Sequence, residues 1–451
     1  MTTSSAESTT TTFPPDAKNS FRFSLFNALN FQITLGAPMI LYAKALGGSA
    51  TTIGIVASLA PLMTVLQLPT AYFIPRVGYK GFVLSGMSAR AVLLFVLAIL
   101  PLLHFLRPVT QVELMLTCLF LFNVVRGIST GAWLPWLTAL IPPGARTNFL
   151  RSDQLHMQCG GMLAIAISTI VLWSGGRPWQ FALLFAISMF SGMLSLHFVG
   201  KIPDIEVGDQ MKSSGQPVPW LAILKYPPFQ KLLTFNVVYS WVVGGLGAFV
   251  IAFLEGKAGY TAGQVLAASL AGAFGAFASV PFIGPVLERT GSKPVLRISL
   301  ALYLIAILFW VFVTGELVPA HYLLVGIDYL LLGIAGGLFS IANVRIAMDT
   351  MPELGRNHFF SLFTVFTSLS LGLAPIFWGV FLDGLAKHEF GLGIFHVNRF
   401  SSYFILLALL GIVTLFLSRP LIERKGKPFE TAIRDVVIMA RLKLYGRFFN
   451  R

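Results

Sequence analysis

Two short sequence patterns each occur twice in this chain, at nearly the same spacing. The segment 71–80, AYFIPRVGYK, aligns with segment 284–293, GPVLERTGSK, so that Arg, Gly and Lys recur at an offset of 213 residues. The segment 141–150, IPPGARTNFL, aligns with 351–360, MPELGRNHFF, at an offset of 210. Since the two patterns are independent, their common spacing predicts that one half of the chain is a duplicate of the other.

The composition places these two halves in a membrane. Hydrophobic residues make up 56% of the chain, charged residues only 11%, and the mean hydropathy is +0.78. A helix needs about 20 apolar residues to cross a bilayer, and the sequence contains twelve such stretches. They lie at 21–41, 52–74, 82–103, 113–135, 152–173, 179–200, 229–254, 262–287, 295–314, 321–346, 359–382 and 400–418. We therefore predict an all-α polytopic membrane protein whose twelve helices form two pseudo-symmetric bundles of six.

The positive charges predict the orientation. Most of the 32 Lys and Arg residues fall in the termini and in the even-numbered connections between spans, and basic residues are retained on the cytoplasmic side. We expect both termini in the cytoplasm and the chain in the plasma (inner) membrane. An anionic inner leaflet also accounts for the net charge of +14, so no nucleic-acid partner is needed.

Five segments follow from this assignment. A disordered cytoplasmic tail (1–20) precedes the first bundle (21–200), and a polar cytoplasmic linker (201–228) leads to the second bundle (229–418). The last segment, 419–451, is basic and amphipathic. It predicts a helix on the inner leaflet, with docking to a partner as the alternative.

Nothing in the sequence indicates a cofactor or a metal. Cys118 and Cys159 are expected at different depths, and the seven His residues are scattered. There is no Walker sequence, so ATP drive is unsupported.

With twelve spans in two halves, the chain resembles the major facilitator superfamily, whose pattern G-x-x-x-[DE]-R-x-G-x-[KR] lies between spans 2 and 3 and recurs between spans 8 and 9. The second copy is close, whereas the first has Ala71 for the glycine and Pro75 for the acid. A further family feature pairs an acid with an arginine seven residues later, as in Asp349 and Arg356. The resemblance implies a cytoplasmic gate made of Arg76, Gly78, Lys80, Arg146, Glu288, Arg289, Gly291, Lys293, Asp349 and Arg356.

Charged residues deep within the spans need an explanation, because an ionised group at mid-membrane is costly unless it is paired or faces water. Arg126 begins RGISTGAW, which is similar to a loose R-x-x-x-G element of the family. We predict that Arg126 binds an anion or couples transport to a proton, with a structural pair between helices as the alternative. Arg90 is interpreted as structural, its side chain snorkelling to the inner headgroups. Asp328 is the candidate proton carrier, or else a hydrogen-bonded partner of a neighbouring group.

Uncharged polar side chains within the spans predict a solute-binding surface. Asn27, Asn30 and Thr34 share one helical face, and amides offer both donors and acceptors. The predicted solute-binding residues are Arg126, Asn27, Asn30, Thr34, Gln158, Tyr239, Trp241 and Asn343. The alternative for the uncharged ones is hydrogen bonding between helices.

The sequence thus predicts a monomeric secondary active transporter, not an enzyme, that works by alternating access. The predicted mechanism is proton-coupled symport of a small polar solute, which is anionic if Arg126 binds it. Two alternatives remain open. One is a proton-independent facilitator or exporter of a more lipophilic solute, and the other is a transporter-like sensor or assembly factor.

Overall fold

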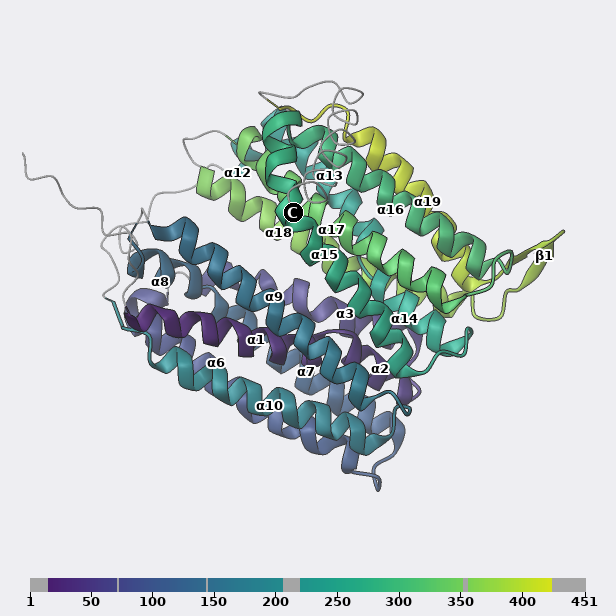
Figure 1. Ribbon diagram of the computed structural model, residues 1–451, viewed down its shortest axis with the longest axis horizontal. Coiled ribbons are helices and arrows are strands. Elements are labelled where there is room, and N and C mark those ends of the chain that lie inside the picture. Colours follow the sequence, from purple (N-terminus) through teal and green to yellow (C-terminus); the bar gives the residue numbers. More distant parts are fainter. Residues whose placement is uncertain (1–14, 71–72, 143–144, 206–219, 352–355, 424–451) are drawn as a thin grey trace, which may run out of the picture. The chain divides into compact units, whose positions relative to one another are not determined.

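The computed structural model describes residues 15–70, 73–142, 145–205, 220–351 and 356–423, and these residues are almost entirely helical (Figure 1). Most of the predicted N-terminal tail, the centre of the linker and most of the basic C-terminal tail lie outside the described residues. The described chain divides into two compact units. Unit 1 contains 59–205 and most of the chain before Gly48, whereas unit 2 contains 220–260 and the chain from Gln264 onward.

Unit 1 consists mainly of helices from the first half of the chain. Its helices are α1 (Asn19–Leu35), α2 (Ala37–Ala45), the end of α3 (Ala50–Thr64), α4 (Gln67–Thr70), α5 (Ile74–Val77), α6 (Tyr79–Ile99), α7 (Pro108–Thr130), α8 (Trp133–Leu140), α9 (Arg146–Val171) and α10 (Pro178–Gly200). Two short 3-10 helices, Pro15–Lys18 and Leu100–Leu102, precede α1 and follow α6.

Unit 2 repeats much of this order. Its helices are the start of α3, α12 (Trp220–Lys225), α13 (Pro227–Val243), α14 (Leu246–Gly256), α15 (Ala262–Thr290), α16 (Ser292–Thr314), α17 (Tyr322–Thr350), α18 (Arg356–Gly384) and α19 (Arg399–Leu417). Ser49–Ser58 belongs to unit 2 and Thr261–Gly263 to unit 1, so α3 and α15 each begin in one unit and continue in the other.

Eleven helical stretches of the described chain are long and apolar enough to cross a membrane. The remaining predicted span, 21–41, is formed by α1 and α2, which are interrupted at Gly36. Gly36 has an extended backbone, and Pro38 lies in the first turn of α2, where its missing N–H costs no hydrogen bond. The predicted seventh span is interrupted too, because Gly245 adopts a left-handed conformation (φ 84°) between α13 and α14.

The helix packing within each unit confirms the internal repeat. In unit 1, α1 packs on α9 and α10, and α6 packs on α7 and α10. In unit 2, α13 packs on α18 and α19, and α16 packs on α17 and α19. The equivalent helices therefore have equivalent neighbours.

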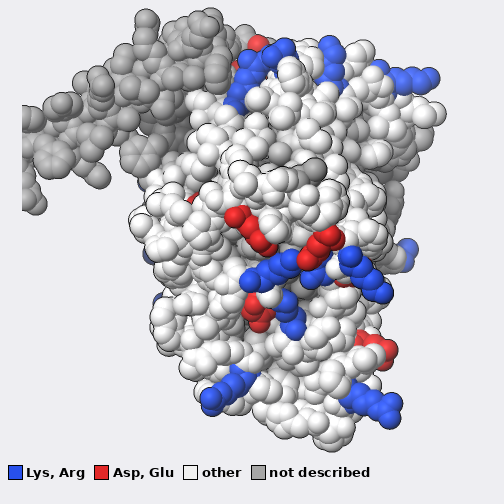
Figure 2. Space-filling model, turned by 90° about the vertical axis from the view of Figure 1, so that its right-hand side faces the viewer, with Lys and Arg blue, Asp and Glu red and all other residues white. Residues whose placement is uncertain are grey.

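A short β-hairpin, which the sequence analysis did not predict, lies between α18 and α19. Its strands β1 (Phe390–Leu392) and β2 (Phe395–Val397) pair antiparallel, with Phe390 opposite Val397. The hairpin is drawn at the right edge of Figure 1, and Figure 2 views the molecule from that side. Acidic and basic side chains are interspersed there on a mostly uncharged surface. One such pair joins Lys257 Nζ to Glu389 Oε1 at 2.7 Å.

Candidate functional site

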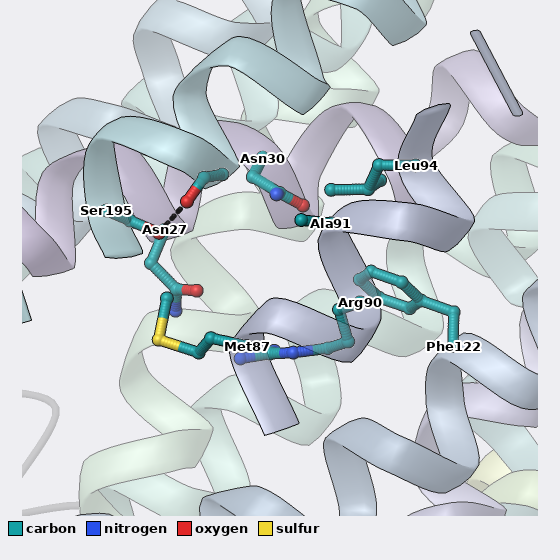
Figure 3. A pocket seen from close by; sticks show the side chains of 9 residues that line it. Asn27, Asn30, Met87, Arg90, Ala91, Leu94, Phe122 and Ser195 are labelled. Atoms are coloured by element: carbon teal, nitrogen blue, oxygen red, sulfur yellow. Dashed lines mark hydrogen bonds between the residues drawn. The ribbon is translucent and has the colours of Figure 1, made fainter. Parts of the chain in front are cut away.

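A small pocket lies inside unit 1, where four helices meet (Figure 3). Asn27 and Asn30 reach it from α1, Arg90 from α6, Phe122 from α7 and Gly192 from α10. Its remaining lining residues are Met87, Ala91, Leu94 and Ser195. Figure 3 shows Asn27 and Arg90 extending toward the same space from different helices. The lining contains a positive charge and two amides, and no acidic residue.

Arg90 does not reach the headgroups, contrary to the expectation from its position in the sequence. Only 5% of the residue is exposed, and its guanidinium carbon lies 5.3 Å from the ring centre of Phe31 and 5.8 Å from that of Phe122. The two rings present negative faces that stabilise a cation. However, Nε and Nη1 of Arg90 have no hydrogen-bond partner among the residues that the structure describes. The rotation of α6 thus directs this side chain into the unit.

Arg126, on α7, is bound by neutral groups only. Its Nη2 donates a hydrogen bond to the carbonyl of Ala60 (2.6 Å), and its Nε donates to Oδ1 of Asn123 (3.2 Å). Its guanidinium carbon lies 5.8 Å from the centre of the Phe31 ring, which also contacts Arg90. Within the described residues neither arginine forms an ion pair. Unit 1 therefore holds two neighbouring positive charges without a bound carboxylate.

The predicted polar face of α1 is divided between two roles. Asn27 and Asn30 line the pocket, and Oδ1 of Asn30 is buried without a hydrogen-bond partner. Thr34 instead shares a 2.7 Å hydrogen bond with the Ser188 hydroxyl of α10, which supports the alternative of bonding between helices. Gln158 is half-buried on α9 and is not part of this pocket.

In unit 2, Asp328 is buried in α17 with a single neutral donor. It is 4% exposed, and its Oδ2 accepts a 2.6 Å hydrogen bond from the indole N–H of Trp310 on α16. Trp310 is itself fully buried, among Phe253 and Phe404. The described residues place no cation in an ion pair with Asp328. The sequence analysis missed Trp310, because spacing along the chain gives no hint that it meets Asp328.

A second polar group of unit 2 lies where α13 meets α17. Nδ2 of Asn343 donates a 2.7 Å hydrogen bond to Oδ1 of Asn236, and Oδ1 of Asn343 is buried without a partner. Tyr239 stacks on Phe339 with ring centres 3.6 Å apart. Trp241 is separate from this group, since its ring packs against Phe377 and Trp378. Of the solute-binding residues predicted in unit 2, the structure brings together Tyr239 and Asn343.

The predicted gate residues are described in part. Nε of Arg146 donates to the carbonyl of Ile141 (3.0 Å), Arg76 is exposed, and Lys80 and Asp349 are half-buried. Gly78 and Gly291 each precede the first residue of a long helix. The side chains of Glu288, Arg289 and Arg356 lie outside the described part of the structure, so the Asp349–Arg356 latch stays a prediction.

Lys293 has partners that the sequence analysis did not foresee. Its ammonium donates to the carbonyl of Leu421 (2.9 Å) and to that of Arg419, just beyond the end of α19. The carboxylate of Glu423 in turn accepts from the backbone N–H groups of Ser292 and, at 3.0 Å, of Lys293. This carboxylate satisfies two of the free N–H groups at the start of α16. The beginning of α16 is thereby held to the segment after α19.

Among the described residues, no group of three or more His, Cys, Asp and Glu side chains lies close enough together to hold a metal ion. The two cysteines are unpaired, with Cys118 buried and Cys159 exposed.

Comparison with known proteins identifies the class of this fold. The family model of the Major Facilitator Superfamily matches residues 23–315 and 264–449. The chain therefore belongs to the Major Facilitator Superfamily, and it is an integral membrane protein of the transporter class. A sequence search of curated proteins finds no match.

Several solved structures share the fold. The nucleoside transporter NupG is 14% identical with a TM-score of 0.66, covering 91% of this chain and 100% of its own. A D-xylose-proton symporter is 13% identical with a TM-score of 0.66, covering 91% and 98%. A POT family transporter in complex with 5-aminolevulinic acid is 14% identical with a TM-score of 0.63, covering 89% and 95%. At these identities the similarity establishes the fold and leaves the solute open.

Proposed function

We propose that this transporter is a proton-coupled symporter for a small polar solute that carries a negative charge. The observation that carries the proposal is the environment of Arg126, a cation within a span whose hydrogen bonds within the described residues go to the Ala60 carbonyl and the Asn123 amide, beside the Phe31 ring. A guanidinium group binds carboxylate and phosphate through parallel hydrogen bonds. An arriving anion therefore supplies the opposite charge that the protein does not.

Asp328 is the proposed proton carrier. A buried carboxylate without a nearby cation is costly in its ionised form, and the Trp310 indole is the single donor bonded to it. Protonation removes that cost, and release of the proton restores the charge. The D-xylose-proton symporter of the same fold couples its solute to a proton, which is consistent with such a mechanism.

The remaining site residues have supporting roles in this proposal. Asn27, Asn30, Gln158, Tyr239, Trp241 and Asn343 contact or orient the solute, and Thr34 positions α1 through its hydrogen bond with Ser188. The residues around the two sequence repeats form the cytoplasmic gate. We further propose that the protein acts as a monomer in the plasma (inner) membrane, with both termini in the cytoplasm, by alternating access between inward- and outward-open states.

Uptake into proteoliposomes tests the proposal. The purified full chain is reconstituted, an inward proton gradient is imposed, and labelled monocarboxylates, dicarboxylates, sugar phosphates, nucleosides and neutral sugars are supplied. We expect an anion to accumulate, a protonophore to abolish the accumulation, and Arg126→Gln to prevent it. Arg22→Gln is the control, because Arg22 is an exposed arginine of the same unit and lies over Phe198.

The other outcomes identify the rival functions. Equilibration of a neutral or lipophilic solute without accumulation, unaffected by the protonophore, would support a facilitator or exporter. In that case the Trp310–Asp328 hydrogen bond is structural. Ligand-induced stabilisation without movement of any solute would support a sensor or an assembly factor.

A further inference from the structure

Arg90 of unit 1 is a buried cation that forms no ion pair within the described residues. Arg90 is 5% exposed within an apolar helix of a membrane protein. Its contacts with Phe31 and Phe122 offset part of the cost of burial. An aromatic ring cannot accept strong hydrogen bonds from Nε and Nη1, however, and the described part of the chain offers neither nitrogen another partner. A buried charge with free donors is expected where a ligand supplies the missing acceptor.

Arg90 is one of the residues that line the pocket, and its side chain extends from α6 toward Asn27 (Figure 3). The carboxamides of Asn27 and Asn30 lie on the other side of the same pocket and provide further hydrogen-bonding groups. Gly192 lets the Asn30 amide pack close to α10, because a Cβ atom at this position would lie 2.5 Å from Nδ2 of Asn30 and 3.1 Å from Cδ1 of Leu94. The pocket is therefore polar on two sides but narrow, with room for about one water molecule, so an oxyanion enters it only if the lining side chains move apart.

We infer that Arg90 is an anion-binding residue and that the pocket beside it binds one oxyanion group, a carboxylate or a phosphate. The inference rests on the proposed function, because the oxyanion belongs to the transported solute. Arg126 is close enough to reinforce the site electrostatically, since both guanidinium groups contact the ring of Phe31. The fork of N–H groups in arginine matches the oxygens of carboxylate and phosphate better than a spherical halide.

Thermal unfolding of the purified full chain tests the inference. Inorganic phosphate, sulfate, acetate and succinate are titrated at constant ionic strength, with sodium chloride as the salt control. A ligand that binds the folded state raises its apparent Tm in a saturable way. The variants are Arg90→Met, Arg90→Lys and Arg126→Gln, with Arg22→Gln as the control for loss of one positive charge.

We expect at least one oxyanion to raise the Tm of the wild type and of Arg22→Gln. Arg90→Met should raise the half-saturating concentration by roughly tenfold or more, since a hydrogen-bonded charge is lost, and Arg90→Lys should retain part of the effect. The ligand-free Tm of Arg90→Met should equal or exceed that of the wild type, because an unpaired buried charge has been removed. A purely structural arginine would give the opposite result, a lower Tm with ligand stabilisation intact, and this would overturn the inference.

The same titrations separate this inference from the proposed function. If stabilisation survives Arg90→Met but is lost in Arg126→Gln, the inference fails and anion transport through Arg126 stands. If no oxyanion stabilises the wild type, the inference fails, and the uptake assay decides the function independently. If inorganic phosphate binds through Arg90 but no organic anion is transported, the pocket stands as a site for a free anion and the proposed solute class fails.

Discussion

Gly78 and Gly291 adopt the same unusual backbone conformation at equivalent places in the two halves. Gly78 has φ 79° and ψ 160° at the start of α6, and Gly291 has φ 87° and ψ 174° at the start of α16. This region of φ and ψ is essentially restricted to glycine. The glycine shared by the two copies of the sequence repeat therefore has a structural reason, because each copy turns the chain sharply into a helix that packs on equivalent neighbours.

We expect Gly78→Ala to destabilise the protein by about 1–3 kcal/mol, the cost of this conformation for a residue with a Cβ atom. Apart from the neighbouring residues in the chain, no atom of the described residues lies within 4 Å of the position that the added Cβ would occupy, so the cost is conformational and not steric. Gly161→Ala is the matched control, since its Cβ also meets open space and its backbone lies in helix α9. It should stabilise by about 0.5–1 kcal/mol. Thermal unfolding measures both, and equal shifts of one sign would contradict the interpretation.

Asp328→Asn should uncouple transport from the proton. The amide preserves the shape of the side chain but cannot take up and release a proton. Accumulation driven by a pH gradient should be lost, whereas exchange of labelled for unlabelled solute should continue. Glu113→Gln, at an exposed position of α7, should leave both activities unchanged. Accumulation by Asp328→Asn at the wild-type level would exclude Asp328 as the proton carrier.

Asp383 should contribute to stability by capping the start of α3. Its carboxylate accepts hydrogen bonds from the backbone N–H groups of Ala50 (3.0 Å) and Thr51 (2.8 Å) and from the Thr51 hydroxyl (2.7 Å). Loss of such a cap costs about 0.5–2 kcal/mol. We expect Asp383→Ala to lower the Tm more than Asp383→Asn, which keeps one acceptor oxygen.

The control for this cap is Asp204→Ala. Asp204 is exposed, and its carboxylate accepts a hydrogen bond from the N–H of the following residue, so its replacement should have little effect on the Tm. If Asp204→Ala and Asp383→Ala had the same effect, the capping role of Asp383 would be refuted.

The Lys257–Glu389 pair should add stability only above acidic pH. The hydrogen bond and the charge of Lys257 lower the pKa of the Glu389 carboxyl below its ordinary value of 4.5. A carboxyl whose pKa is lower in the folded state stabilises the fold above the unfolded pKa, and this contribution is lost as the pH falls through the folded pKa.

The difference in Tm between the wild type and Glu389→Gln should therefore be constant from about pH 7 to about pH 5 and vanish in more acidic buffer. Lys257→Gln should reproduce the effect and Lys387→Gln, at an exposed position nearby, should not. A difference that persists unchanged in acid would show that the ion pair is not its source.

The sequence by itself determined the membrane class, the repeat and the residues that are unusual within spans. Hydropathy and length are enough to identify the membrane-spanning segments, because a segment of about 20 apolar residues is stable across a bilayer almost regardless of its neighbours. The glycines of the repeat were identifiable for a similar reason, since their backbone conformation is a local property. Arg126 and Asp328 are recognisable from the sequence as charged residues in the middle of apolar spans.

Only the tertiary structure decided which side chains contact these charged and polar residues. Hydropathy does not fix the rotation of a membrane helix about its axis, because lipid and the protein interior are both apolar. The same sequence position thus allowed Arg90 to snorkel outward or to enter the unit, and packing against Phe31 and Phe122 directs it inward. Likewise, Trp310 meets Asp328 from the preceding helix, 18 residues away, and Ser188 meets Thr34 across 154 residues. Contacts of this kind depend on which helix faces are brought together, and that information is absent from each segment taken alone.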